Sequence, residues 1–482
     1  MPKLIVVEKP EAWQFNLEDV DVITPDKYIS EEAYQSLRNL KVINLCKSYQ
    51  YQSEGYYVSL LAEARGHKVL PGVSTIQDLR FPSILRDDSL DFDELIQNTF
   101  KNETYDRIEF NIYFGNAQSE HLTRLAQQLF QMVQAPSIRA SFSKKHKWVL
   151  HNIKPISINE VPESDKPRLS QALEKYLHRK RDYRPDKKKH DLAILVNPDD
   201  ANPPSDDRAL KRFYKAALEA GFNTEFITKN DFDQLIQYDA LFIRETTNVN
   251  HHTFRFAKKA ASLGLVVIDD PESILKCTNK VYLHELLRAN KILTPKSFVI
   301  TEENCEQLPT KIGFPFILKQ PDGAFSKGVF KIDSLDEFKK VRESMFEKSD
   351  LLIAQEFLPT PFDWRVGVLD GQVLYVCKYF MATQHWQIIN WSAKQQKSQE
   401  GEVESIAVDQ APSGLLKTAV KATNLIGRSL YGVDMKEVDD KFYVIEINDN
   451  PNIDAGIEDK ILKDKLYDTI MEVILTKVKS KA

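Results

Sequence analysis

The chain has 482 residues, of which 42% are apolar and 28% are charged, and its formal net charge is −5. This composition is typical of a folded, water-soluble protein, and the length predicts several domains of roughly 150 residues each. The slightly acidic balance gives no general reason to expect binding to nucleic acid or to an anionic membrane.

The first predicted elements form an α/β layer. Residues 4–7 and 42–45 are short, branched and apolar, as buried strands are. A tyrosine-rich loop at residues 48–57 follows the second strand. A helix comes next, because apolar residues recur at i, i+3, i+4 and i+7 from Tyr57 to Ala64. Loops in this position bind small ligands in many open α/β sheets, although tyrosines that simply pack the loop are an equally good interpretation.

An alternating strand at residues 107–114 begins a second group of elements. Helices are predicted near residues 122–132 and 169–176, with a further strand at residues 148–158. The following run, residues 178–189, is strongly basic and contains a proline. We interpret this run as a solvated linker between domains, because the near absence of aromatic residues argues against a nucleic-acid site.

A second α/β unit follows the basic run, with strands predicted at residues 192–196, 238–244 and 265–268 and helices at residues 209–220 and 253–263. Arg244 and Glu245 lie at the carboxyl end of one of these strands, where open α/β sheets place ligand-binding groups. The guanidinium could hold a substrate carboxylate through two parallel hydrogen bonds. An ion pair at the surface is an equally good interpretation.

Two lysines and a loop of small residues mark the next segment. Lys280 precedes a predicted helix at residues 281–289, and Lys319 ends a predicted strand. The loop at residues 321–329 lies between two strands, and backbone N–H groups in such loops can bind phosphate. The loop has only two glycines and matches no Walker pattern, so this signal is weak by itself. A buried strand at residues 351–358 and a hairpin around Asp370-Gly371 follow.

A second hairpin near the C-terminus carries oxygen-rich side chains. Residues 443–448 alternate as a strand does, so Glu446 and Asn448 project from the same face. Asp439-Asp440 predicts a tight turn that brings Asp434 beside them. Carboxylate and amide oxygens are the ligands that Mg²⁺ prefers when it also binds substrate phosphates. A polar edge strand with an acidic, solvated turn is the alternative interpretation.

The motifs of the C-terminal half, and their order along the chain, resemble those of the ATP-grasp superfamily. The motifs that carry the similarity are Lys280 before a helix, the strand end Ile317-Leu318-Lys319, the loop Phe325-Ser326-Lys327-Gly328, the strand Gln355-Glu356-Phe357-Leu358, Asp363-Trp364-Arg365, Lys378, and the set Asp434, Glu446, Asn448 and Pro451. Within the superfamily the chain is most similar to the RimK-type ligases, which add amino acids to carboxylates.

The resemblance covers nearly the whole chain and implies its architecture. Residues 192–275 resemble the pre-ATP-grasp domain of such ligases and of bacterial glutathione synthetase, and residues 51–71 resemble the RimK-like ATP-grasp N-terminal domain. The implied fold is α/β, with an α+β C-terminal half. The implied domains are a RimK-like ATP-grasp N-terminal domain at 1–185, a pre-ATP-grasp domain at 190–276, an ATP-grasp small lobe at 277–358, and a large lobe with the metal site at 359–482.

The resemblance also implies roles for residues at matching positions. The implied ATP-binding residues are Lys280, Lys319 and Ser326 for the phosphates, Gln355, Glu356, Phe357 and Leu358 for adenine, and Asp363 for the ribose. Arg365 and Lys378 would face the γ-phosphate and the acyl-phosphate, Asn390 would belong to the substrate loop, and Arg244 would bind the acid. Asp434, Glu446 and Asn448 would ligate Mg²⁺, or Mn²⁺ in its place.

Two segments depart from the RimK-type pattern. The substrate loop usually continues Asn-x-His-Arg-Gly-Gly, whereas here it reads Asn390-Trp391-Ser392-Ala393-Lys394. Pro451-Asn452 also replaces the usual Pro-Gly after the metal residues. The first departure weighs against a glutamate-adding enzyme that acts on a ribosomal protein.

The function that these features imply is an ATP- and Mg²⁺-dependent ligase, which joins a carboxylate to an amine through an acyl-phosphate and releases ADP and phosphate. Alternatives are an ATP-grasp kinase and a non-catalytic nucleotide-binding scaffold. The expected partners are ATP and small-molecule or peptide acids and amines, with no nucleic acid or membrane, in a homo-oligomer.

Cysteines and apolar runs predict the location of the protein. The four cysteines are scattered along the chain and form no C-x-x-C pattern, which favours a reducing, cytoplasmic setting. They are Cys46, Cys277, Cys305 and Cys377. The N-terminus leads into a strand rather than a signal peptide, and the longest apolar runs are far too short to cross a bilayer.

Overall fold

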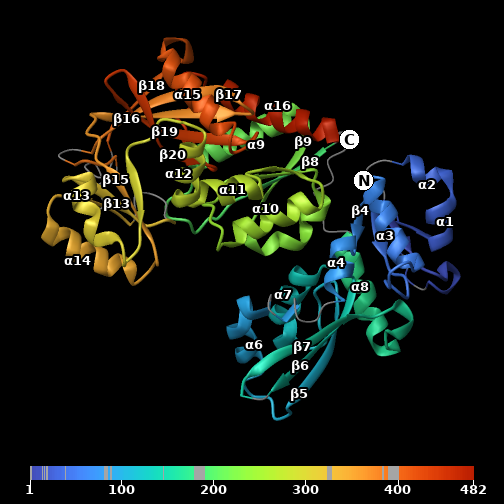
Figure 1. Cartoon of the computed structure of the whole chain (residues 1–482). Helices are drawn as coiled ribbons and strands as arrows, with labels where there is room; N and C mark the ends of the chain where they lie inside the picture. The colour runs from blue at the N-terminus through green and yellow to red at the C-terminus, as the bar shows by residue number, and fades with distance from the viewer. Residues whose placement is uncertain are drawn as a thin grey trace. The chain divides into compact units, whose positions relative to one another are not determined.

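The computed structural model describes residues 3–13, 15, 17, 20–37, 40–80, 85–86, 89–144, 146–177, 190–322, 328–382, 385–388 and 401–481. The chain forms two compact units (Figure 1). The first comprises Met1–Lys187 with Phe232–Ile236 and Ala482, and the second comprises Lys188–Asp231 and Gln237–Lys481. Over the described part of the chain, every helix is too short or too polar to cross a membrane. The basic run at 178–189 lies outside the described residues.

The first unit begins with the predicted α/β layer. Its parallel sheet has the order β2-β1-β3-β4, formed by β1 (Lys3–Val6), β2 (Val20–Ile23), β3 (Lys41–Asn44) and β4 (Lys68–Leu70). The helices of this layer are α1 (Pro25–Ser30), α2 (Glu32–Ser36), α3 (Glu54–Ala64) and α4 (Val73–Asp78). β1 and β3 are almost entirely buried, because both faces of a parallel sheet are covered.

The helix α3 forms where predicted, but the apolar positions that indicated it lie on its more exposed side. Tyr57 is 38% exposed and Leu60 is 36% exposed. The buried side instead carries Gly55 and Ser59, whose backbone and hydroxyl oxygens accept hydrogen bonds from the amide of Asn44 at 2.7 and 2.9 Å. Small residues let the helix approach β3 closely, so contact with the sheet decides the buried face.

A three-stranded antiparallel sheet completes the first unit. Its order is β5-β6-β7, formed by β5 (Arg107–Tyr113), β6 (Ser137–Lys144) and β7 (Trp148–Pro155). The helices α6 (Asp93–Thr99), α7 (Thr123–Val133) and α8 (Lys166–Leu177) accompany it. Phe100 packs between Phe142 and Trp148, with ring centroids 4.9 and 5.1 Å away. The alternation predicted for β5 fits a sheet with one buried face.

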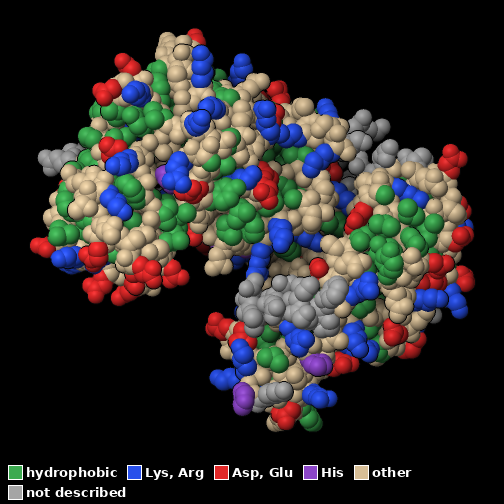
Figure 2. Space-filling view, in the orientation of Figure 1, with side chains coloured by type: hydrophobic (Ala, Val, Ile, Leu, Met, Phe, Trp, Pro, Cys, Tyr) green, Lys and Arg blue, Asp and Glu red, His purple; other side chains and the backbone are tan. Residues whose placement is uncertain are grey.

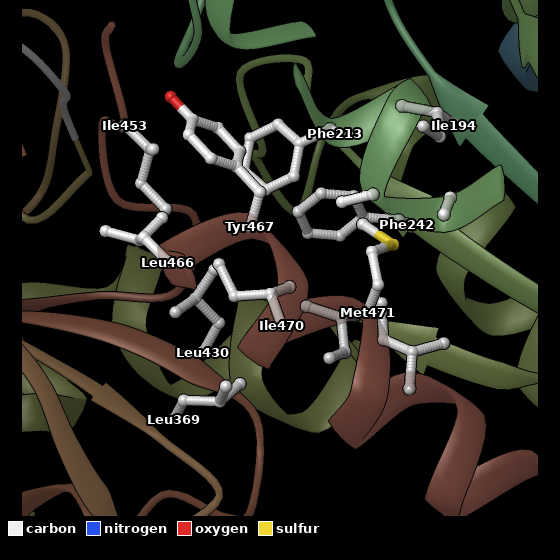
Figure 3. Packing of buried hydrophobic residues seen from close by; sticks show 14 of the residues in the cluster. Ile194, Phe213, Phe242, Leu369, Leu430, Ile453, Leu466, Tyr467, Ile470 and Met471 are labelled. Carbon is white, nitrogen blue, oxygen red and sulfur yellow. The ribbon is translucent and has the colours of Figure 1, made fainter. Parts of the chain in front are cut away.

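The second unit begins with a parallel sheet of the order β11-β10-β8-β9. Its strands are β8 (His190–Leu195), β9 (Phe222–Ile227), β10 (Ala240–Ile243) and β11 (Val266–Ile268), and its helices are α9 (Asp207–Ala220), α10 (His252–Ser262) and α11 (Pro271–Thr278). The C-terminal helix α16 (Asp464–Lys481) lies beside α9 (Figure 1). Phe213 of α9 contacts Phe242 and Tyr467 with ring centroids 5.0 and 4.7 Å away, and this core joins the sheet to α16 (Figure 3).

A four-stranded antiparallel sheet of the order β12-β15-β13-β14 follows. It consists of β12 (Ser297–Ile300), β13 (Phe316–Lys319), β14 (Val329–Ile332) and β15 (Leu352–Glu356), with helices α13 (Leu308–Ile312) and α14 (Leu335–Phe346). Phe338 of α14 packs on Phe316 of the sheet. Acidic side chains gather over the outer side of α14 (Figure 2).

The last sheet is antiparallel and has the order β18-β17-β16-β19-β20. Its strands are β16 (Phe362–Leu369), β17 (Gln372–Phe380), β18 (Val403–Ile406), β19 (Leu430–Val438) and β20 (Lys441–Asn448), packed with α12 (Lys280–Ala289) and α15 (Ser413–Thr423). Both predicted hairpin turns are confirmed. Asp370-Gly371 and Asp439-Asp440 all have positive φ, as two-residue hairpin turns that match the strand twist require.

Candidate active site

The hairpin of β19 and β20 brings three oxygen-bearing side chains together, as its pattern predicts. Asp434 is directly opposite Glu446, and Gly432 is opposite Asn448. The amide Nδ2 of Asn448 donates a hydrogen bond to Oδ2 of Asp434 at 3.2 Å. Cross-strand neighbours share a face of the sheet, so the three side chains form one cluster.

Each carboxylate of this cluster faces a cation from another element. Arg365 of β16 is opposite Asp434 in register and donates to it through Nε and Nη2, the latter at 2.9 Å from Oδ2. Lys280, the first residue of α12, places Nζ 3.0 Å from Oε1 of Glu446. The amide of Asn279 caps this helix, and the backbone N–H of Lys280 donates to Pro321 O at 2.9 Å. These contacts fix the lysine at the start of the helix.

Lys319 approaches Glu446 from the other antiparallel sheet. Its Nζ donates to Oε1 of Gln355 at 2.7 Å, and Lys280, Lys319 and Gln355 line a narrow cavity of about 30 Å³. Burial lowers the pKa of Lys319 to about 8, although the carboxylate of Glu446 favours its charged form. Residues predicted to bind ATP phosphates and adenine therefore meet at the junction of the two antiparallel sheets.

The two acids differ in their electrostatic surroundings. Burial raises the pKa of Asp434, and this effect outweighs the neighbouring guanidinium of Arg365. Burial also acts on Glu446, but the ammonium groups of Lys280 and Lys319 outweigh it and lower the pKa of this carboxyl. Glu446 therefore keeps its negative charge at neutral pH and is the better anionic ligand of the pair.

The donor set fits a magnesium ion. Glu446 and Asp434 supply carboxylate oxygens, and both hydrogen bonds of the Asn448 side chain use Nδ2, which leaves Oδ1 as a ligand. Hard oxygen donors of this kind suit Mg²⁺, which binds few carboxylates together with substrate phosphates. Because Arg365 already engages both oxygens of Asp434, Glu446 and Asn448 are the more accessible ligands.

A further lysine belongs to this site and was not predicted from the sequence. Lys436 donates to Oδ1 of Asp363 at 2.5 Å and to Thr360 at 2.7 Å. It follows Asp434 by two residues on β19, so both side chains project from the same face. That spacing is the sequence signal that could have identified it. Asp363, predicted to contact the ribose, is therefore held on the same face as the acids.

The adenine-binding candidates lie at the end of β15 and directly after it. Gln355 is 8% exposed, whereas Glu356 is exposed and its backbone N–H donates to Lys296 O at 2.8 Å. The ring of Phe357 lies 5.1 Å from Nζ of Lys331, and Leu358 beside it is half-buried. Ser326 and Asn390 lie outside the residues that the structure describes.

Lys378 does not lie with the other cations, which weighs against its predicted role at the γ-phosphate. It is opposite Trp364 in register, whereas Arg365 is opposite Cys377, so Lys378 and Arg365 project from opposite faces of the sheet. Its Nζ lies 5.1 Å from the ring of Trp364 and 3.6 Å from a carboxylate oxygen of Glu404. Lys378 therefore packs on aromatic rings behind the acidic cluster.

Arg244 also differs from its predicted role, because it is only 1% exposed. Its guanidinium donates to Ser205 Oγ, to Asn450 Oδ1 at 2.7 Å and to the carbonyl oxygens of Pro204 and Pro451. These partners come from the loop after β8 and the loop after β20. The geometry favours a structural tie between two segments over contact with a substrate carboxylate.

The tyrosine-rich loop of the first unit lines a separate cavity of about 610 Å³. Tyr49 donates its hydroxyl to Asn44 O at 2.6 Å, which fits the packing interpretation, whereas Tyr51 is 58% exposed. Tyr49 therefore packs the loop, and ligand binding by the exposed part of the loop stays a prediction.

Two protein-family models match parts of this chain. A model described as RimK-like ATP-grasp domain matches residues 277–474, and a model described as RimK-like ATPgrasp N-terminal domain matches residues 25–172. The chain is a RimK-like ATP-grasp protein. Its ATP-grasp fold has parallel α/β sheets in the N-terminal part and the antiparallel sheets of β13 and β20 in the C-terminal part.

Several curated proteins resemble this RimK-like ATP-grasp protein. The alpha-aminoadipate–LysW ligase LysX of Saccharolobus solfataricus is 26% identical over 48% of this chain and 79% of its own length. The tetrahydromethanopterin:alpha-L-glutamate ligase of Methanocaldococcus jannaschii is 28% identical over 55% of this chain and 88% of its own. A probable alpha-L-glutamate ligase of Vibrio atlanticus is 26% identical over 52% of this chain and 80% of its own.

Proposed function

We infer that this protein is an ATP-dependent ligase that joins a carboxylate to an amine. The observation that carries the inference is the convergence of Lys280, Lys319 and Arg365 on the acids Asp434 and Glu446. Such a set can neutralise a triphosphate and stabilise the charge on a transferring phosphoryl group. The family match and the ligases among the relatives support the same reaction class.

In the proposed reaction the substrate carboxylate attacks the γ-phosphate of ATP, ADP leaves, and the amine then displaces phosphate from the acyl-phosphate. Lys280 and Lys319 hold the ATP phosphates, and Arg365, oriented by Asp434, meets the transferring phosphoryl group. Glu446 and Asn448, with Asp434, would hold Mg²⁺ or Mn²⁺, which supplies further positive charge to the phosphate oxygens. In-line positioning and charge neutralisation account for most of the catalysis in reactions of this type.

We propose an α-amino acid as the amine. Two of the relatives are named as ligases of L-glutamate, and a third is named for alpha-aminoadipate and the protein LysW. The present chain would join an amine of the same class to a small-molecule or peptide acid.

A screen for ATP-dependent mass gain tests the proposed function. The protein is incubated with MgATP, a mixture of amino acids and a pool of small acids and peptides, and products are detected by mass spectrometry. We expect a product whose mass equals acid plus amino acid minus water. The Lys378→Ala variant should form the same product, because this lysine lies behind the site, whereas Arg365→Ala should form none. A phosphorylated acid or alcohol as the only stable product would overturn the ligase assignment.

The lowered pKa of Lys319 predicts how ATP binding depends on pH. ATP phosphates require the charged ammonium, whose pKa in the free protein is about 8. Between pH 7 and pH 9 the free lysine loses its proton, so ATP affinity should fall by about 10-fold, since binding must then take up a proton. Titration calorimetry at the two pH values measures this change.

The Lys319→Arg variant is the matched control for this prediction. A guanidinium stays charged over the whole range, so the decline in ATP affinity should largely disappear. Lys319→Ala should weaken ATP binding at pH 7 by at least about 10-fold, in line with the loss of a charge-assisted contact. An unchanged affinity in Lys319→Ala, or the same decline in Lys319→Arg, would show that Lys319 does not contact the phosphates.

A further inference from the structure

A second cluster of ligand-type side chains lies in the same unit, apart from the acids and lysines around Glu446. Glu245 follows β10 by two residues, and His251 and His252 form the N-cap and first residue of α10. One carboxylate oxygen and one nitrogen from each ring all lie within 4.8 Å of one another. Glu245 and His251 also line a cavity of about 790 Å³. The cluster therefore has a route to the outside.

The burial of Glu245 is the first indication of a ligand. Its side chain is 1% exposed, and neither carboxylate oxygen accepts a hydrogen bond from any residue that the structure describes. The Nε2 atom of His252 is likewise buried and has no hydrogen-bond partner among the described residues. Buried charges in proteins are almost always paired with hydrogen-bond donors or bound to metal ions. The carboxylate thus requires a partner that its protein neighbours do not supply through hydrogen bonds.

The relation between Glu245 and His252 is the second indication. Nε2 of His252 lies 2.9 Å from Oε1 of Glu245, which is close enough for an ion pair, yet the two atoms do not have hydrogen-bond geometry. Two ligand-type atoms this close, without a hydrogen bond between them, can bind one ion together. Tetrahedral zinc bonds of about 2.0–2.2 Å place two ligand atoms roughly 3.3–3.6 Å apart, so shifts of about 1 Å in the side chains would bring the three ligand atoms to these distances.

A neighbouring hydroxyl group orients the ring of His251. Nδ1 of His251 lies 3.1 Å from the hydroxyl oxygen of Thr253. Contacts of this kind orient the rings of metal-binding histidines.

We propose that Glu245, His251 and His252 form a binding site for a divalent transition-metal ion such as Zn²⁺. Two imidazole nitrogens and one carboxylate oxygen suit zinc and its neighbours, whereas the all-oxygen set around Glu446 suits Mg²⁺. Three protein ligands leave a coordination position open towards the cavity. Polar side chains of Asn197, Asp200 and Asn248 line that cavity, and a carboxylate or amine of a small molecule could complete the coordination. The site does not depend on the proposed ligase activity.

Titration calorimetry with ZnCl₂ tests this site in the full-length protein, with excess MgCl₂ present to occupy hard oxygen sites. We expect a Zn²⁺ site in the wild type, and its affinity should fall by at least about 10-fold in Glu245→Gln and in His252→Ala. Glu446→Gln and His121→Ala, which alter the proposed magnesium site and an exposed histidine of the first unit, should bind Zn²⁺ as the wild type does.

Binding of Co²⁺ provides a readout that does not depend on heat or activity. Co²⁺ in the wild-type site should show visible absorption bands that are absent from His252→Ala, and circular dichroism verifies that the variants are folded. No Zn²⁺ binding by the wild type, or undiminished binding by both Glu245→Gln and His252→Ala, would overturn the proposal and leave Glu245 and His252 as an ion pair only.

Discussion

Glu446→Gln should lower the rate of ligation by at least about 10²- to 10³-fold, the effect typical of removing one group that stabilises the transition state. Glu446 is the acid whose pKa is held low by Lys280 and Lys319, so it carries the negative charge of the proposed metal site. Glutamine keeps the shape but removes the charge that binds the ion. Initial rates of product formation at limiting Mg²⁺ measure the effect.

The fold should survive this substitution. Glu446 is partly exposed beside the cavity, and its side chain does not belong to the apolar core. Glu404→Gln is the matched control, because this acid pairs with Lys378 behind the site and should retain wild-type rates. Ligation by Glu446→Gln at the wild-type rate would favour the polar edge-strand interpretation of β20.

Arg244→Met should lower the melting temperature by roughly 10 °C, as expected when the loss of a buried guanidinium and its hydrogen bonds to several neutral acceptors costs about 3–5 kcal/mol. The side chain is 1% exposed, and its removal leaves Ser205, Asn450 and two carbonyl oxygens without their donor. Methionine fills much of the space, so the effect reports the lost hydrogen bonds more than a cavity. Differential scanning calorimetry measures the shift.

Arg288→Met is the control for this prediction. Arg288 is 65% exposed and pairs with Glu285 one helical turn away, an arrangement that contributes little to stability. Its melting temperature should stay close to the wild-type value. If Arg244→Met instead melts as the wild type does and only raises the KM for the acid, Arg244 binds substrate after all.

Local patterns in the sequence predicted the acidic hairpin correctly. Alternation over β20 placed Glu446 and Asn448 on one face, and the Asp439-Asp440 turn brought Asp434 beside them. These features depend on neighbours in the chain and on the period of a strand. Local signals also placed Lys280 correctly at a helix start and Lys319 at a strand end.

Contacts between segments that are distant along the chain could not be predicted from local sequence patterns. The partners of Arg244 include Asn450 and Pro451, more than 200 residues further along the chain. The face on which Lys378 projects depends on the register between β16 and β17, and a shift of one residue would have exchanged the two faces. The buried side of α3 depends on its close approach to β3 rather than on its own apolar residues.

The central claim is that phosphoryl transfer to the acid is followed by attack of an amine. Steady-state release of ADP, measured with the acid identified by the mass screen and with the amine present or omitted, tests this claim most directly. Sustained ADP release only when both acid and amine are present, at one ADP per product, is the predicted result. Sustained ADP release that is unaffected by omission of the amine would contradict the account and indicate a kinase.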